Sequence, residues 1–136
     1  MDALNNYGPL AGRVLIALIF VLSGFGKLTG FEATINSIAS KGVPLPQLAA
    51  VTAIVVELGG GIMLMLGWKA RWAAAAIAAF TLLAALIFHA FWAAAPAQAH
   101  GQMVHFMKNI AICGGLLYVV VYGSGPMSLD GRSRRS

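Results

Sequence analysis

One carboxylate lies inside a long apolar run, and it is the residue of this sequence most clearly suited to take part in chemistry. Residues 51–66 read VTAIVVELGGGIMLML, with Glu57 as the single charged side chain. A membrane-spanning helix needs about 20 mostly apolar residues, so Glu57 is expected near mid-bilayer, too deep for its short side chain to reach water. A carboxylate at that depth must be protonated or paired with a cation.

Basic and polar side chains of other apolar segments are the candidate partners of Glu57. Helical side chains lean toward the N-terminus of their own helix, so Glu57 is expected to lean outward and His89 to lean inward to meet it. The expected depths predict a Glu57–His89–Lys108 cluster in the outer half of the membrane. Lys27 is expected above this cluster, and Asn109 extends it. Chemically, Glu57 and His89 would handle protons, while Lys27, Lys108 and Asn109 would bind anionic or carbonyl oxygens.

The same residues are compatible with two further roles. A buried ion pair that only specifies helix packing requires no chemistry, and a perturbed group in a cleft indicates function only statistically. A haem or metal site is conceivable, because His89, His100 and His105 all fall near the outer face. However, the helical spacing of His and carboxylate ligands is absent, so no metal is predicted. The single cysteine, Cys113, excludes an internal disulfide and is expected to pack between helices.

Glycines are predicted to let the helices around Glu57 approach closely. Gly60 and Gly61 share a helical face with Glu57, and Gly114 and Gly115 lie on a later apolar run. Small residues at such positions are typical of close helix packing in membranes.

The composition of the whole chain places these residues in a membrane protein. The 136 residues are 60% hydrophobic and 10% charged, with a mean hydropathy of +0.83, whereas soluble domains carry about 25% charged residues. No basic stripe interleaved with aromatics indicates nucleic-acid binding. We predict a single all-α domain, residues 1–136, built as an integral membrane bundle of four transmembrane helices. The expected spans are about 10–28, 46–67, 72–94 and 103–123.

The segments between the spans carry their own signals. Thr29 and Glu32 have the spacing of a capping box, apolar side chains then recur on one helical face, and Gly42 suits a helix stop. A short amphipathic interfacial helix is therefore predicted in the first outer loop. Residues 93–102 are expected to form a small mobile loop. The first span is expected to be a retained helix rather than a cleaved signal peptide, since no A-x-A site follows it.

The distribution of basic residues predicts the orientation. Six lie with the termini and the second loop: Arg13, Lys69, Arg71, Arg132, Arg134 and Arg135. Three lie toward the opposite face: Lys27, Lys41 and Lys108. The positive-inside rule then places both termini in the cytoplasm, with residues 124–136 as a cytoplasmic tail. Asp130 in this tail is expected to pair with Arg13 or Arg71.

Five segments, taken in order, give the sequence a family resemblance. They are SGFGKLTGF at 23–31, VELGGGIMLMLGW at 56–68, FH at 88–89, FMKNIAICGGLL at 106–117 and GSGPMSLD at 123–130. Together they resemble the DoxX family of small bacterial membrane proteins with four helices. The family's polar positions fall here on Lys27, Glu57, His89, Lys108 and Asn109, with Ser128 and Asp130 at the cytoplasmic end.

The resemblance implies a function only in outline. The family name comes from a subunit of a membrane thiosulfate:quinone oxidoreductase, and other members are described as membrane partners in oxidoreductase assemblies. It implies a bacterial inner-membrane subunit or partner of an oxidoreductase system. The residues themselves predict an outer-half pocket that binds quinone or another small molecule, and the sequence shows no redox centre of its own. The alternative is a non-catalytic accessory or scaffold subunit, with a membrane protein partner or a second copy. A small transporter is a further, weaker alternative, since four helices without repeats offer no obvious pathway.

Overall fold

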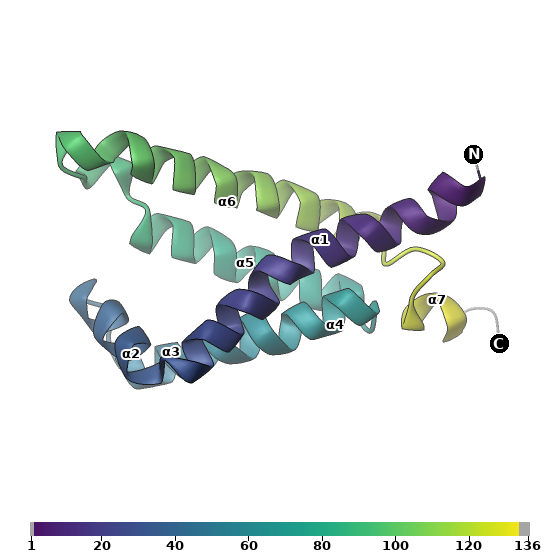
Figure 1. Cartoon of the computed structure of the whole chain (residues 1–136), viewed down its shortest axis with the longest axis horizontal. Helices are drawn as coiled ribbons and strands as arrows, with labels where there is room; N and C mark the ends of the chain where they lie inside the picture. The colour runs from purple at the N-terminus through teal and green to yellow at the C-terminus, as the bar shows by residue number, and fades with distance from the viewer. Residues whose placement is uncertain (1, 134–136) are drawn as a thin grey trace.

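Each apolar run of the sequence is a helix in the computed structural model, which describes residues 2–133 (Figure 1). Four of its helical segments are long and apolar enough to cross a membrane: Asp2–Thr29, Pro46–Leu66, Ala70–Ala93 and Pro96–Tyr122. The prediction of an all-α bundle with four membrane helices is therefore confirmed. In chain order the elements are α1 (Asp2–Thr29), α2 (Phe31–Ser40), α3 (Pro46–Ile54), the π-helical turn η1 (Val55–Gly59), α4 (Gly60–Leu66), α5 (Ala70–Phe88), the 3-10 turn η2 (Phe91–Ala93), α6 (Pro96–Tyr122) and α7 (Leu129–Ser133).

The helices differ from the predicted spans mainly at their ends. The second span agrees closely, but α1 begins well before residue 10 and α6 begins at Pro96 rather than near residue 103. The expected loop at 93–102 is mostly helix, because proline suits the first turn of a helix and the alanines that surround it have high helix propensity. Conversely, α5 ends at Phe88, so that His89 caps the helix instead of lying inside it.

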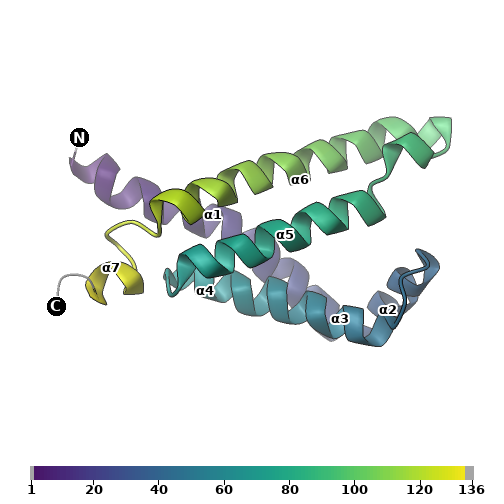
Figure 2. The same cartoon turned by 180° about the vertical axis from the view of Figure 1, so that it is seen from behind.

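Two helix pairs make up the bundle. The continuous segment α3–η1–α4 packs along α1, and α5 packs along α6, with α4 and α5 joining the pairs (Figures 1 and 2). Both termini lie at the same end, which we call the termini end; α2 and η2 lie at the opposite end, the α2 end (Figure 1). The largest fully buried side chains are Leu64, Ile77 and Leu116. Buried alanines surround them, so the packed core depends on small residues that let the helices approach closely.

The predicted helix between the first two spans is present as α2, but it does not begin with a capping box. Gly30 is its N-cap and makes no side-chain hydrogen bond. Thr29 still belongs to α1, and its hydroxyl lies 3.1 Å from the carbonyl oxygen of Phe25 and 3.2 Å from that of Gly26. The capping-box prediction was wrong because this hydroxyl is already used within α1. Gly42 does have the positive φ, 71°, that a helix stop favours.

The C-terminal segment packs against the bundle rather than extending as a tail. Ser124 and Ser128 are buried at the termini end, and α7 follows them. Asp130 accepts hydrogen bonds from the backbone N–H groups of Lys69 and Ala70, at 2.8 and 2.9 Å, and so caps α5. The expected ion pair of Asp130 with an arginine is not among the ion pairs of residues 2–133. Arg134 and Arg135 lie outside the described residues.

Gly24 determines how closely α1 approaches η1, and this gives a first testable prediction. A Cβ atom at Gly24 would lie 2.6 Å from the backbone nitrogen of Leu58 and 2.8 Å from its Cβ atom. Because backbone cannot yield as a flexible side chain does, we expect Gly24→Ala to lower the free energy of unfolding by about 2 kcal/mol.

The control for this prediction lies on the same helix. A Cβ atom at Gly26 would meet nothing within 4 Å, so Gly26→Ala should leave stability unchanged or raise it slightly through helix propensity. Unfolding by SDS in mixed micelles measures both variants. Equal stability of the two variants would show that α1 can move away from η1 at no cost in free energy.

Candidate functional site

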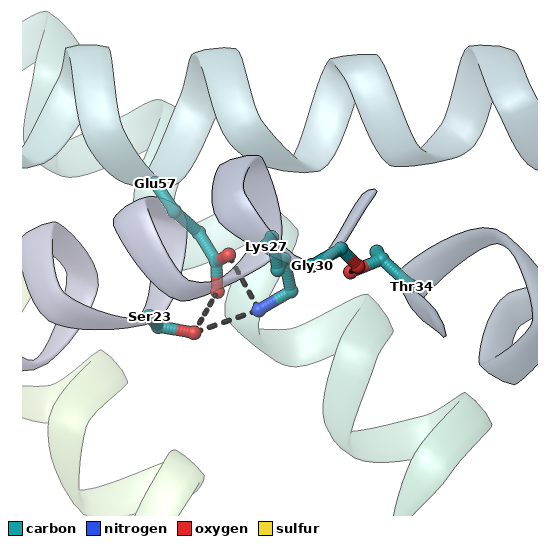
Figure 3. A network of polar contacts seen from close by, with 5 residues as sticks. All are labelled: Ser23, Lys27, Gly30, Thr34 and Glu57. Atoms are coloured by element: carbon teal, nitrogen blue, oxygen red, sulfur yellow. Dashed lines mark hydrogen bonds and ion pairs between the residues drawn. The ribbon is translucent and has the colours of Figure 1, made fainter. Parts of the chain in front are cut away.

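Glu57 lies inside the bundle and forms an ion pair with Lys27 of α1. The Nζ atom of Lys27 is 2.7 Å from Oε2 of Glu57, and the exposed fractions of the two side chains are 29% and 8%. Ser23 joins the pair: its hydroxyl donates to Oε1 of Glu57 at 3.3 Å and accepts a hydrogen bond from Lys27 at 2.7 Å (Figure 3). We call these three residues the Ser23–Lys27–Glu57 triad. They hold a buried carboxylate whose charge is balanced by an ammonium group.

Local structure explains why these three side chains meet. Ser23 and Lys27 are four residues apart on α1 and therefore lie one above the other on the same helical face. Glu57 lies in the π-helical turn η1, where the backbone N–H of Gly60 bonds to the carbonyl of Val55, five residues earlier. Such turns are rare and occur often at functional sites. The close approach of α1 at Gly24 then brings the carboxylate within reach of Lys27.

The predicted direct cluster of Glu57 with His89 and Lys108 is not formed. His89 is hydrogen-bonded through Nδ1 to the side-chain oxygen of Gln102 at 2.9 Å, and its ring stacks on His105 with centroids 5.1 Å apart. The Nζ atom of Lys108 lies 3.4 Å from Nδ1 of His105. Because α5 ends one residue before it, His89 lies at the α2 end, where its hydrogen bond is to Gln102. The cation that pairs with Glu57 is thus Lys27.

A large cavity nevertheless connects the predicted residues. It has a volume of about 960 Å³, lies between α1, α2 and α3 on one side and α5 and α6 on the other, and is lined mostly by apolar side chains. Its polar lining includes all five predicted residues: Lys27, Glu57, His89, Lys108 and Asn109. A cavity of this size is at the upper end of the range for small-molecule sites. The predicted residues therefore line one cavity, and within residues 2–133 the ion pair among them joins Lys27 and Glu57.

The glycines and the cysteine have different surroundings. Cβ atoms built on Gly60 and Gly61 would approach Ile77 and Val21 to 3.1 and 3.0 Å, and one on Gly115 would approach Ile16 to 3.0 Å. One built on Gly114 would meet nothing within 4 Å, so Gly114 does not make the close contact that was expected of it. Cys113 is a free thiol whose Sγ atom lies 3.5 Å from the carbonyl oxygen of Ala78.

Two hydroxyl residues of this region were not identified from the sequence. Ser23 bridges the ion pair, and Thr81 of α5 lines the cavity, although its hydroxyl oxygen is buried away from it. The position of Ser23 four residues before Lys27 was an available signal, since such pairs share a helical face. Among residues 2–133, no three His, Cys, Asp or Glu side chains gather where they could ligate one metal ion. The groups available to bind a ligand are thus ammonium, carboxylate, hydroxyl, amide and imidazole.

These features define an all-helical membrane bundle in which a buried ion pair borders a large apolar cavity. The chain belongs to the DoxX family, whose family model matches residues 8–90, and the resemblance seen in the sequence is thereby confirmed.

Relatives named as membrane proteins match most of the chain. It is 37% identical over 123 residues to the "Inner membrane protein YphA" of Escherichia coli K12, covering 90% of this chain and 88% of that protein. It is 36% identical over 130 residues to the "Inner membrane protein YqjF" of the same organism, covering 96% and 95%. A shorter match, 35% over 87 residues, covers 64% of this chain and 63% of the "Putative oxidoreductase CatD" of Bacillus subtilis. No solved structure matches.

Proposed function

We propose that this protein is a bacterial inner-membrane subunit or partner of an oxidoreductase system and that it binds a quinone-like or other small molecule in its cavity. The observation that carries the proposal is the Ser23–Lys27–Glu57 triad at the wall of a large, mostly apolar cavity. The names of the E. coli relatives support the inner membrane, and the name of the B. subtilis relative supports a link to oxidoreductases. With both termini in the cytoplasm, as the basic residues indicate, the cavity belongs to the outer half of the bundle.

The lining of the cavity fits an amphipathic ligand. Apolar side chains would hold a ring and a hydrocarbon tail, while the triad offers an ammonium donor and a carboxylate to a polar headgroup. Lys108 and Asn109 add donors to ligand oxygens, and Glu57 and His89 are the groups able to exchange protons with it. A bound quinone would supply the redox chemistry. The chain itself would position the headgroup and exclude water from it.

The proposal predicts that Glu57→Gln weakens quinone binding. Gln keeps the shape of Glu57 but removes its charge, so a headgroup oriented by the ion pair should lose about tenfold in affinity. The measurement is a titration of the purified protein in lipid nanodiscs with a decyl-substituted benzoquinone, followed by tryptophan quenching and by calorimetry.

Lys41→Met is the matched control for this titration. Lys41 is exposed at the α2 end and does not line the cavity, so the substitution removes a charge from the same end of the protein without changing the site. Identical affinity of wild type, Glu57→Gln and Lys41→Met would remove the quinone-like ligand from the proposal.

An accessory role without catalysis is the second candidate function, and the exposure of α6 favours it. Only 6% of the most apolar window of α6 is buried, against 22–28% for the other three membrane helices. A membrane protein partner or a second copy could cover this face. Co-purification of a stoichiometric partner, with function surviving Glu57→Gln combined with Lys108→Met, would favour this candidate over ligand binding.

A further inference from the structure

A second, smaller cavity lies at the termini end of the bundle. It has a volume of about 280 Å³ and is formed by the start of α5, the end of α6 and the segment 123–131 that follows α6. We call it the termini-end pocket. None of its described lining residues lines the large cavity. Its size is just below the range of drug-sized ligand sites, so it suits a small headgroup or ion.

Arg71 is available to bind an anion in this pocket. Its guanidinium lies beside Gly123 of the pocket wall: the Nε and Nη2 atoms are 3.4 and 3.6 Å from the position that a Cβ atom on Gly123 would take. The residue is exposed, and within residues 2–133 its side chain takes part in no ion pair or hydrogen bond. Arg13, by contrast, donates to three backbone carbonyl oxygens. The N–H donors of the Arg71 guanidinium are therefore free for a ligand.

Asp130 also lines the termini-end pocket, but its carboxylate is bound to the backbone of α5. Its oxygens accept hydrogen bonds from the N–H groups of Lys69 and Ala70, at 2.8 and 2.9 Å. The N-terminus of a helix stabilises a carboxylate bound there, so this negative charge is balanced locally. No ion pair joins Asp130 to Arg71 within residues 2–133. Lys69 and Arg132, which are both exposed, add positive charge at this end.

Aromatic side chains indicate the depth of the pocket in the membrane. Trp72, next to Arg71 in the chain, and Tyr122, in the pocket wall, are 78% and 75% exposed. Tyr118 stacks on Tyr122 with ring centroids 5.7 Å apart. Exposed Trp and Tyr at the ends of membrane helices are typical of the depth at which lipid headgroups lie. We therefore expect the pocket to meet the phosphate groups of the bilayer, beside the largely exposed apolar surface of α6.

We propose that the termini-end pocket binds a phosphate group and that the guanidinium of Arg71 is its anion-binding side chain. A planar guanidinium can donate two parallel hydrogen bonds to phosphate oxygens, and basic pockets between membrane helices suit anionic headgroups. The phosphate group belongs either to an anionic phospholipid, with its acyl chains along α6, or to free inorganic phosphate. This site is separate from the large cavity, so the inference goes beyond the proposed function and does not depend on it.

The test measures the binding of two probes by purified protein in maltoside micelles. Native mass spectrometry gives the affinity for phosphatidylglycerol relative to phosphatidylcholine with the same acyl chains, and calorimetry without lipid gives the affinity for inorganic phosphate. We expect Arg71→Met to bind about tenfold more weakly than the wild type. Arg71→Lys should recover only part of the loss, because an ammonium group keeps the charge but not the planar fork. A preference for phosphatidylglycerol identifies a lipid headgroup, whereas binding of inorganic phosphate without that preference identifies a free anion.

Arg132→Met is the matched control. Arg132 is an exposed arginine at the same end that does not line the pocket, so its loss should weaken binding about threefold at most. Because the Arg71 side chain has no bonded partner within residues 2–133, Arg71→Met should unfold in SDS like the wild type, and its loss of binding then arises at the site. Equal losses in Arg71→Met and Arg132→Met would mean that anions gather on a basic surface rather than in the pocket, and would overturn the inference. Unchanged affinity of Arg71→Met, or a wild type that binds neither probe, would overturn it as well.

Discussion

Lys27→Met should destabilise the protein by about 3 kcal/mol, whereas combining it with Glu57→Gln should restore most of that loss. Removing one partner of a buried ion pair leaves the other charge uncompensated, which costs several kcal/mol, while replacing both partners by neutral groups can be nearly without effect. Glu57 is the more deeply buried partner, so the loss of Lys27 is the harmful change. Ser23 alone, at 3.3 Å from the carboxylate, cannot balance its charge.

The single change at Glu57 should cost less than the single change at Lys27. Lys27 is 29% exposed and lies toward the α2 end of α1, so its long side chain can carry the ammonium toward the interface when its partner is lost. Gln also retains an oxygen that can accept the hydrogen bond of Ser23. Glu57→Ala, which retains neither charge nor oxygen and leaves a void, should be less stable than Glu57→Gln.

SDS unfolding of the four proteins of this double-mutant cycle measures the coupling of the pair. Lys41→Met is the control, because it removes an exposed lysine at the same end. Strictly additive losses in the cycle would show that Lys27 and Glu57 do not stabilise each other, and the buried pair would then have no structural role.

The fold could be predicted from the sequence because hydropathy is a property of whole segments. Four apolar runs of sufficient length predict four membrane helices whatever their mutual arrangement. The errors lie at the ends, where the signal is weak. The start of α6 at Pro96 and the long polar beginning of α1 depend on helix propensity and packing rather than on hydropathy. The prediction of a capping box for α2 was wrong because the hydroxyl of Thr29 is hydrogen-bonded within α1.

The candidate site could be predicted from the sequence only in part. Periodicity gives the depth of each side chain along its helix, and it therefore predicted that the five candidate residues lie in one half of the bundle, where they line one cavity. It does not give the rotation of the helices about their axes. The π-turn at Glu57 adds one residue to a helical turn, which shifts later positions by about 100° relative to a regular helix. The predicted contact with His89 assumed that His89 lies inside its helix, whereas α5 ends at Phe88 and the structure pairs Glu57 with Lys27.

The hydroxyls of the site illustrate a second limit of sequence analysis. Serine and threonine in apolar helices usually bond to their own backbone, so their presence carries little information. Ser23 and Thr81 become informative only when their partners, or the lack of one, are known. The same holds for Gly24, whose close approach to Leu58 depends on the crossing of two helices that are distant in sequence.

Among residues 2–133, Arg13 is the other charged residue that is buried, and its surroundings could not be anticipated from its position in the first half of α1. Its side chain is 2% exposed at the termini end. Nε donates to the carbonyl oxygen of Met65 at 3.3 Å, Nη2 donates to that of Met127 at 3.0 Å, and Nη1 donates to that of Ser124. The guanidinium thus joins α1 to the end of α4 and to the C-terminal segment. It donates hydrogen bonds to carbonyl oxygens that have no partner within a helix.

Arg13→Met should therefore be the most damaging single change in the protein, with a loss of about 4 kcal/mol in the free energy of unfolding. Methionine fills a similar volume but donates no hydrogen bonds, so three carbonyl oxygens lose a charge-assisted partner in a buried place. Arg13→Lys should recover only part of the loss, because one ammonium group cannot reproduce the planar fork of the guanidinium.

Arg71→Met is the control for Arg13→Met, since Arg71 is exposed at the same end and its loss should change stability by less than about 0.5 kcal/mol. SDS unfolding gives the stabilities, and limited proteolysis of the C-terminal segment shows where the loss arises. Because α7 caps α5 through Asp130, release of that segment in Arg13→Met should also expose the start of α5 to cleavage. Stability and proteolysis indistinguishable from those of Arg71→Met would mean that the C-terminal segment is held by packing alone, without the guanidinium.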